Sequence, residues 1–352
     1  MMKAEYKRLG DYIVAVDERN SDLSITLSQG INNNKYFQQP RQVAENSAND
    51  KIVRRGYFAY NRATTRNGDK ISIAYREGED CTVSAAYQVF YIKNEELLNP
   101  HYLLLWFKRP TFDRYARFKS HGSAHEFFEW DEMCNVMLPV PSIEEQRRIV
   151  SQYQTVENRI KNNERLIALL EDTAQTIFRH RFVDNIDTNN LPEGWRMGTV
   201  EELCMIKNGK ANVAGSGDIP IYGGNGIVGY TDNSNAQDVI IIGRVGINCG
   251  SLFLPQGKCY VNDNAMTATP YDGNINFLYA LLDSLNLNGQ SEGSGQPLLT
   301  QSIIYKLECV IPDDSSRKEY ETKSSIMNRH ISLIEKEIIF LTSTKETLIN
   351  SL

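Results

Sequence analysis

The stretch LPVPSIEEQRRIV, residues 138–150, joins an apolar strand to a charged helix through two prolines. A related junction, CVIPDDSSRKEYE, follows at residues 309–321. In the first copy, Ser142 and Glu145 have the spacing of a capping box, in which a serine hydroxyl and a glutamate carboxylate satisfy free amides at a helix N-terminus. The two junctions therefore predict that one long helix begins shortly after Pro141 and a second begins shortly after Pro312.

The first of these helices has the apolar spacing of a coiled coil. Side chains recur at alternating steps of four and three residues from Ile149 to Ile177, and no Gly or Pro interrupts before Pro192. Adding 171 to each number gives a second, mostly apolar series from Tyr320 to Leu348. The expected seam consists of Ile149, Tyr153, Val156, Ile160, Asn163, Ile167 and Leu170 in the first helix and Met327, Ile331, Ile334, Ile338 and Leu341 in the second.

Two long helices with narrow apolar stripes each need a partner along the stripe. The first helix runs from one globular segment toward the next, and the second helix starts from that next segment, so pairing would be antiparallel. Asn163 lies in the expected seam, where a polar residue costs stability but fixes the register. In the alternative interpretation, each helix packs separately on its own domain.

The globular segments also repeat. Each has a β-rich middle, at 70–92 and 238–261, followed by a short helix, at 100–108 and 275–285. The expected fold class is therefore α+β: two pseudo-repeated α+β domains joined by two long helices that form an antiparallel coiled coil. The expected boundaries are 1–141 and 195–311 for the domains, 142–183 and 312–352 for the helices, and 184–194 for the linker.

The composition is that of a globular protein, with 41% hydrophobic and 23% charged residues among 352. The N-terminal residues lack the apolar stretch of a signal peptide, and the six scattered cysteines are typical of reduced core side chains, so we expect a cytoplasmic location. The formal net charge of −6 argues mildly against a freestanding nucleic-acid-binding protein, which usually has a basic surface. A partner that supplies positive charge would remove this objection.

Catalytic motifs are weak in this sequence. Asp313, Glu321 and Lys323 resemble the acidic pattern of metal-dependent nucleases, but that chemistry needs the carboxylates on adjacent strands, and these residues fall at the start of the second long helix. The stretch DIPIY (218–222) faintly resembles the D-P-P-Y motif of amino-methyltransferases, but its second position is Ile219 and its fourth is Ile221, and no glycine-rich cofactor loop accompanies it. We therefore expect no enzyme activity, no metal and no cofactor in this chain.

Binding motifs are stronger. Cations, aromatic rings and small polar side chains lie together at 51–70 and at 107–123, where Lys108, Arg109, Arg114, Arg117 and Lys119 face one acid, Asp113. The second segment instead has glycine-rich loops with Asn, Gln and Ser at 220–233, 243–250 and 288–297. The DNA-binding candidates are Arg54, Arg55, Arg62, Thr64, Thr65, Arg66, Lys70, Lys119, Ser123, Lys207, Lys210, Tyr222, Asn225, Arg244, Asn248 and Gln296.

The whole chain resembles the specificity subunits of type I restriction–modification systems. The resemblance rests on two recognition segments, on P-x-x-E-E-Q-R-x-I at 141–149, and on FAYNR (58–62) and YGGNGIVGY (222–230). The second junction departs from the pattern because it lacks the E-E-Q run. The resemblance implies a non-catalytic subunit whose two domains each read half of a bipartite site on double-stranded DNA, with the helices setting the gap.

The same resemblance implies partners and their cofactors. Two modification (methyltransferase) subunits would bind the helices, and two ATP-dependent restriction subunits would complete the complex. S-adenosylmethionine, ATP and Mg²⁺ would then be bound by those partners and not by this chain. Two alternatives remain open from the residues: a coiled-coil scaffold that joins protein partners without DNA contact, and a nuclease.

Overall fold

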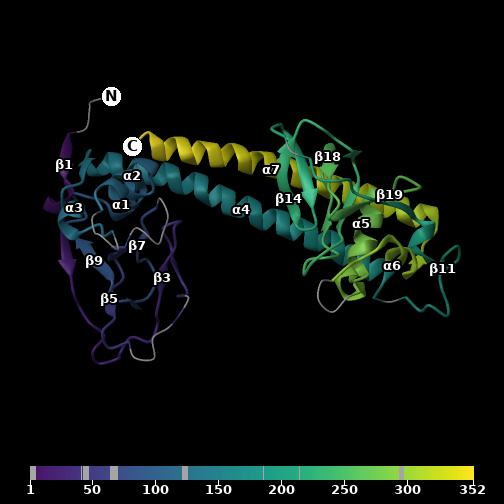
Figure 1. The fold of residues 1–352 in the computed structure, drawn as a ribbon, viewed down its shortest axis with the longest axis horizontal. Helices are drawn as coiled ribbons and strands as arrows, with labels where there is room; N and C mark the ends of the chain where they lie inside the picture. The colour runs from purple at the N-terminus through teal and green to yellow at the C-terminus, as the bar shows by residue number, and fades with distance from the viewer. Residues whose placement is uncertain are drawn as a thin grey trace. The chain divides into compact units, whose positions relative to one another are not determined.

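The structure, a computed structural model, describes residues 5–40, 42, 47–63, 70–120, 126–184, 186–213, 215–292 and 297–352. The chain divides into two compact units, drawn in Figure 1. The first unit comprises Met1–Lys161 and Ile339–Leu352, and the second comprises Asn162–Ile338. The division passes through both long helices, so each unit contains one globular lobe and parts of both helices.

The lobe of the first unit is built on a four-stranded antiparallel sheet with the order β2-β9-β6-β7. Helix α1 packs on this sheet through a core that contains Phe58, Phe90, Leu103 and Phe107, all fully buried. The strands are β1 (Tyr6–Arg8), β2 (Ile13–Val16), β3 (Gly30–Ile31), β4 (Phe37–Gln38), β5 (Lys51–Val53), β6 (Phe58–Asn61), β7 (Ile73–Tyr75), β8 (Cys81–Val83), β9 (Tyr87–Ile92) and β10 (Met137–Pro139). The helices are η1 (Leu9–Asp11), α1 (Pro100–Phe107), α2 (Pro110–Phe118) and α3 (Trp130–Cys134).

The lobe of the second unit repeats this plan around a sheet with the order β12-β19-β16-β17. A second sheet has the order β14-β13-β18-β15. The strands are β11 (Arg196–Thr199), β12 (Cys204–Asn208), β13 (Ile219–Gly223), β14 (Gly226–Thr231), β15 (Ala236–Gln237), β16 (Ile240–Gly243), β17 (Leu252–Phe253), β18 (Lys258–Val261), β19 (Ala265–Pro270) and β20 (Glu308–Ile311). The helices are η2 (Val200–Glu202), α5 (Ile275–Ser284), η3 (Leu287–Gln290) and α6 (Gln301–Tyr305).

Each lobe has its own pair of entry and exit strands, and the two pairs are equivalent in the repeat, as the central sheets are. In the first unit β1 pairs with β10, and in the second β11 pairs with β20, each antiparallel. The paired exit strand then leads directly into a long helix, α4 (Ile143–Phe182) or α7 (Asp314–Asn350). The predicted α+β fold with two long helices is confirmed.

The helix starts are capped by equivalent residues, 171 positions apart. The hydroxyl of Ser142 accepts a hydrogen bond from the Glu145 amide at 3.3 Å, and the carboxylate of Asp313 accepts one from the Ser316 amide at 2.9 Å. The serine half of the predicted capping box is therefore present. The acidic half needs correction: the carboxylate of Glu145 bonds to Arg148 one turn along α4, at 2.6 and 2.7 Å.

The glutamine of the first junction is an internal contact of the lobe. Gln146 is fully buried, and its side chain donates to the carbonyls of Leu97 and Pro141 while it accepts from the amide of Asn99. These bonds attach the start of α4 to the loop before α1, where Asn99 caps that helix. A buried amide with three partners fixes this geometry because each bond would be costly to leave unmade.

The second junction makes the same attachment with different chemistry. Arg317, which occupies the position equivalent to Gln146, forms an ion pair with Asp272 in the loop before α5. Its guanidinium is mostly buried, with 16% of the side chain exposed. Where the first junction has the glutamine of its E-E-Q run, the second therefore has a charged contact in place of a neutral one at the equivalent position of the repeat.

The two long helices pair antiparallel within each unit. In the second unit, Arg181 bonds to Glu319 at 2.7 Å and Asn163 donates to Glu337 at 3.0 Å, so residue numbers rise along α7 as they fall along α4. In the first unit, the end of α7 lies against the lobe, where Ile349 packs on the core. Figure 1 shows α4 in teal and α7 in yellow.

All twelve predicted seam positions are at least partly buried. Tyr153, Ile160, Asn163 and Ile331 are 3–9% exposed. The remaining seam positions are half-buried: Ile149, Val156, Ile167, Leu170, Met327, Ile334, Ile338 and Leu341. By contrast, Leu166 and Leu169 of α4, and Ile326 and Leu333 of α7, are 44–59% exposed. The helices therefore have an apolar seam and a second, solvent-facing apolar set.

Candidate nucleic-acid interface

Arg54, a predicted DNA contact directly after β5, is paired with two carboxylates at the surface of the first lobe. Its guanidinium pairs with Glu18 and with Asp80, at 2.7 Å for the latter, and these carboxylates raise the pKa of Arg54. The neighbouring Arg55 has an exposed side chain, and its backbone amide donates to Asp80 at 2.8 Å. Both side chains reach solvent, but the guanidinium of Arg54 is already paired with carboxylates.

Two more predicted cations of the first lobe have protein partners. Arg62 donates to the Ala86 carbonyl at 3.3 Å and pairs with Glu129 at 3.3 Å, while its guanidinium lies 5.8 Å from the centre of the Phe127 ring. Lys119 lies 3.5 Å from Glu132. These exposed pairs are weak enough to be exchanged for a phosphate. The candidates that lie outside the described residues are Thr64, Thr65, Arg66, Ser123 and Gln296.

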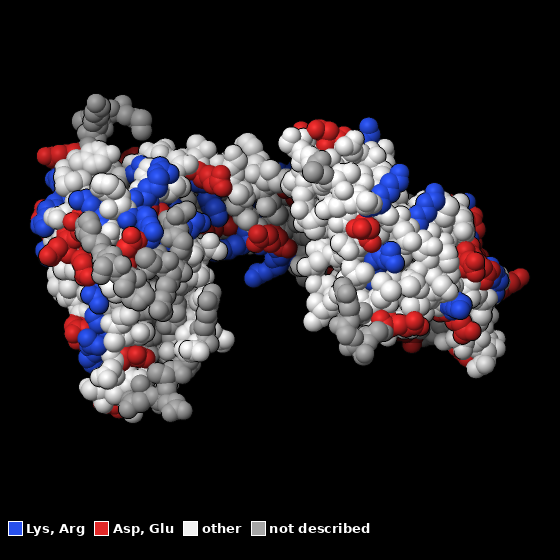
Figure 2. All heavy atoms as spheres, in the orientation of Figure 1, with Lys and Arg blue, Asp and Glu red and all other residues white. Residues whose placement is uncertain are grey.

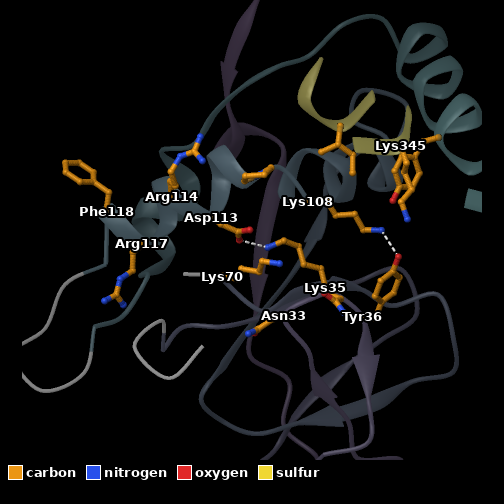
Figure 3. A pocket seen from close by; sticks show the side chains of 14 residues that line it. Asn33, Lys35, Tyr36, Lys70, Lys108, Asp113, Arg114, Arg117, Phe118 and Lys345 are labelled. Atoms are coloured by element: carbon orange, nitrogen blue, oxygen red, sulfur yellow. Dashed lines mark hydrogen bonds and ion pairs between the residues drawn. The ribbon is translucent and has the colours of Figure 1, made fainter. Parts of the chain in front are cut away.

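Lys70 is the predicted residue that the structure places at a concave surface. It lines a cleft of about 940 Å³ in the first unit together with residues of the β3–β4 turn, of α2 and of the end of α7 (Figure 3). We call this the basic cleft. Its lining residues are Asn33, Asn34, Lys35, Tyr36, Lys70, Lys108, Pro110, Asp113, Arg114, Arg117, Phe118, Tyr153, Lys345 and Ile349.

A buried ion pair forms the floor of the basic cleft. Lys35 is 4% exposed, and its ammonium lies 2.6 Å from the Asp113 carboxylate and 2.9 Å from the Ile71 carbonyl. Asp113 also accepts from the Ile71 amide at 3.2 Å. Burial lowers the pKa of Lys35, and Asp113 opposes that shift. The pair ties the β3–β4 turn to α2, and each charge offsets the other.

One wall of the cleft is a chain of hydrogen bonds that ends on α4. Lys108 donates to the Tyr36 hydroxyl at 2.9 Å, and Tyr36 donates to the Glu157 carboxylate at 3.2 Å. Tyr153 also donates to Glu157, at 3.3 Å. Burial, helped by Glu157, raises the pKa of Tyr36 to about 12, so the phenol keeps its proton. The wall therefore connects the lobe to the first turns of the helix pair within the same unit.

In the second unit, the predicted residues lie on separate loops and strands. Lys207 on β12 and Lys210 just after it are exposed, and Asn225 is exposed at the turn between β13 and β14. Tyr222 is half-buried, with its ring 5.9 Å from that of Phe253. Figure 2 shows basic side chains of this unit spread singly among uncharged atoms, whereas those of the first unit gather with acids near α1 and α2.

The glycine-rich loop after β16 combines packing with an exposed tip. A Cβ on Gly243 would lie 2.2 Å from the Gly224 carbonyl, so glycine is required there for backbone packing. Asn248 is exposed at the tip, beside Ile247, whose side chain is 85% exposed. Arg244 is half-buried, and its Nε atom is buried without a hydrogen-bond partner among the described residues. The tip is therefore the part of this loop that is available to a ligand, whereas Gly243 is packed against backbone.

The acids that resemble a nuclease motif have structural partners. Asp313 caps α7 and also accepts from the Trp195 indole at 2.9 Å. Glu321 accepts from the amides of Asn276 and Phe277 at 2.8 and 3.1 Å, so it caps the N-terminus of α5 from a distant helix. Both carboxylates are engaged with donors of the protein, and the described residues contain no cluster of three metal-ligating side chains.

Sequence reasoning overlooked Lys35, although it found the clusters that contain Lys70, Lys108 and Arg114. Lys35 stands in an ordinary polar turn with a positive φ of 67°, and its partner Asp113 is 78 residues away. No local pattern reports such a pair. Among the described helices, none is long and apolar enough to cross a membrane.

A family model described as "Type I restriction modification DNA specificity domain" matches residues 12–172 and 192–340. Similar curated proteins include the type I restriction enzyme EcoprrI specificity subunit of Escherichia coli, 33% identical over 95 residues, and the MjaIX specificity subunit of Methanocaldococcus jannaschii, 25% identical over 120 residues. These alignments cover 26% and 31% of this chain, and only 24% and 28% of the relatives' own lengths.

Solved structures resemble the chain over nearly its whole length. The S subunit of a type I restriction–modification system from M. genitalium aligns with a TM-score of 0.63 at 14% identity, covering 99% of this chain and 96% of that one. A chain from a study of complex assembly and conformational transition of the type I system aligns with a TM-score of 0.51 at 15% identity, with 99% and 97% covered. At these identities the likeness shows a shared fold.

Proposed function

Since the chain belongs to the family of type I restriction–modification DNA specificity domains, we propose that it is the non-catalytic subunit that selects the DNA sequence. Each lobe would read one half of a bipartite site on double-stranded DNA. Methylation and cleavage would be performed by partner subunits in the cytoplasm, and these would bind S-adenosylmethionine, ATP and Mg²⁺.

The observation that carries this proposal is the repeat of lobe, junction and helix. Ser142 and Gln146 in one copy correspond to Asp313 and Arg317 in the other, so each lobe is attached to its helix by contacts at equivalent positions. A protein that repeats a binding lobe within one chain is suited to a ligand with two separate half-sites. A rigid connection raises the effective concentration of the second lobe once the first has bound.

The outer faces of the long helices suit protein partners. Leu166 and Leu169 on α4, and Ile326, Leu333 and Phe340 on α7, are 44–70% exposed although they stand on well-formed helices. Such apolar side chains outside the seam are typical of surfaces that another subunit covers. We assign them to two modification subunits, with two restriction subunits completing the complex.

Footprinting of the chain together with its modification subunit tests the function. We expect protection of two short blocks of duplex, separated by a gap that is not read. An unprotected duplex would favour instead a scaffold that joins proteins without DNA contact. The purified chain alone is expected not to cut DNA, because the acids of the second junction are engaged as helix caps. It is expected not to methylate DNA either, because no glycine-rich cofactor loop accompanies the DIPIY stretch.

Sequencing of methylated positions in a host that expresses the chain with its partners would identify the two half-sites. We expect one bipartite motif whose half-sites differ, because the two lobes present different loops. A motif without a gap would contradict the assignment of one half-site to each lobe.

A further inference from the structure

The basic cleft has an excess of positive charge that its own acids do not balance. Six lining residues are cationic, namely Lys35, Lys70, Lys108, Arg114, Arg117 and Lys345, and Asp113 is the acid among the lining residues. These cations come from the β3–β4 turn, the segment before β7, the end of α1, α2 and the end of α7. Their convergence on one concavity requires tertiary folding, since no sequence segment contains more than a few of them.

Three of the six cations are already paired with carboxylates. Lys35 is neutralised by Asp113 at 2.6 Å, and Arg117 lies 2.7 Å from Glu126. The ammonium of Lys345 lies 3.9 Å from the Glu157 carboxylate, which also accepts hydrogen bonds from Tyr36 and Tyr153. Three positive groups then remain to attract a ligand: Lys70, Lys108 and Arg114.

Those three cations lack carboxylate partners among the described residues. The ammonium of Lys108 donates to a phenol, that of Tyr36, and Lys70 and Arg114 are exposed side chains without an ion pair in the described part of the chain. Burial lowers the pKa of Lys108, Glu157 opposes that shift, and the neighbouring Lys345 and Lys161 act in the same direction as burial. Like charges gathered in this way repel one another, so a bound anion would relieve the repulsion.

The shape of the cleft favours a phosphate without a stacked base. The faces of the Tyr36 and Tyr153 rings are occupied by the Lys108 ammonium, which lies 4.6 and 5.3 Å from the ring centres. The Phe118 side chain points away from Lys35 and Lys70 in Figure 3 and is 79% exposed. The lining therefore offers cations, with the Asn33 and Asn34 amides beside them, and no open aromatic face inside for a base.

We propose that the basic cleft is a phosphate-binding site in which Lys70, Lys108 and Arg114 contact the backbone of DNA bound by the first lobe. The inference rests on the proposed function and adds to it a position where DNA is held without being read. Arg114 can present its planar guanidinium to two phosphate oxygens, whereas Lys70 acts as a point charge. A free nucleoside phosphate shares the same chemistry and is the other source to test.

The test measures binding of the full-length chain, in complex with its modification subunit, to a pool of labelled random duplexes between about 50 and 200 mM salt, by fluorescence anisotropy. Lys70→Ala and Arg114→Ala should each reduce the slope of log K against log salt concentration by about 0.9, and the double variant by nearly twice that. Affinity should fall equally for random duplexes and for the recognised site. Arg114→Lys should restore most of the slope, because it keeps the charge.

Lys7→Ala is the control, since it removes an exposed cation of the same unit that does not line the cleft and lies 3.6 Å from Glu5. It should leave the slope unchanged. The affected side chains are exposed, so unfolding midpoints should match wild type. A double variant with the wild-type slope would overturn the site while leaving the proposed function intact, whereas a wild-type complex with the modification subunit that binds no duplex at all would overturn both.

A second titration, with ATP and with inorganic phosphate, separates the two sources. We expect no saturable binding of either at millimolar concentration. Saturable ATP binding that disappears in the double variant, together with an unchanged DNA slope, would assign the cleft to a free nucleotide and overturn the DNA contact.

Discussion

Single buried polar side chains determine how each lobe joins its helix. The side chain of Gln146 makes three hydrogen bonds inside the first lobe, and Arg317 makes an ion pair at the equivalent place in the second. Buried polar groups that are fully satisfied define one geometry, because any displacement breaks several bonds together. The glutamine of the P-x-x-E-E-Q motif therefore has a structural role in this chain.

Replacing Gln146 should destabilise the first unit. Gln146→Leu leaves the Asn99 amide and two carbonyls without partners, and we expect a loss of about 2–3 kcal/mol in the free energy of unfolding. Denaturant unfolding followed by circular dichroism measures it. Arg147→Ala, which removes only the exposed pair with Glu96, should cost under about 1 kcal/mol, and an equal cost for both variants would contradict the assignment.

Asp313 should make stability sensitive to acid. Hydrogen bonds from Ser315, Ser316 and Trp195 hold the pKa of Asp313 well below its usual value of 3.8. A carboxylate whose pKa is lower in the folded state than in the unfolded state stabilises the fold at pH values above the unfolded-state pKa. This stabilisation is lost as the pH falls through the folded-state pKa. We expect the melting temperature of Asp313→Asn to fall less than that of wild type between pH 5 and about pH 2. Identical pH profiles would contradict this role.

At the scale of elements, the long helices carry two apolar faces with different tasks. The seam side of α7 includes Ile331, which is 9% exposed, whereas Leu333, two residues further on, is 59% exposed. Burial of the first face stabilises the chain itself. The second face has no such role in the described residues, which is why we assign it to modification subunits.

Two alanine substitutions on α7 separate these tasks. Ile331→Ala should cost about 2–4 kcal/mol of stability because it opens a cavity in the seam. Leu333→Ala should change stability by less than about 0.5 kcal/mol, yet weaken binding of the modification subunit. Thermal unfolding and a binding assay with that subunit give the two readouts, and a Leu333→Ala chain that binds like wild type would remove this face from the interface.

For the whole molecule, the length of the helix pair should set the distance between half-sites. Residues 164–170 of α4 and 330–336 of α7 lie opposite each other, because Asn163 bonds to Glu337 just beside them. Deleting both heptads keeps the seam in phase and shortens the pair by roughly 10 Å. We expect the recognised gap to shrink by about three base pairs, as measured by sequencing of methylated sites.

Duplicating the same two heptads is the complementary control, and it should lengthen the gap by a similar amount. Loss of recognition on deletion is also consistent with the helices setting the spacing, since the shortened pair would present the lobes at the wrong rotation around DNA. An unchanged gap in both variants would show that the helices do not determine it.

The sequence by itself determined the long helices, the α+β repeat and the helix caps. These features depend on local spacing. A helix cap lies three residues before the amide from which it accepts a hydrogen bond, and an apolar seam places an apolar residue at every third or fourth position. Ser142 and Asp313 could be found in this way, because a cap and the amide that it accepts from are neighbours in the chain.

The tertiary structure alone decided which charges are available to a ligand. Arg54 and Lys70 stand in the same basic stretch, yet Arg54 is paired with Glu18 and Asp80 while Lys70 faces the basic cleft. Glu321 became a cap for α5 for the same reason, through a contact 45 residues away in sequence. Electrostatic interactions depend on the distance between charges in space. That distance cannot be inferred from residue types or from their spacing in the sequence, because folding brings distant residues together.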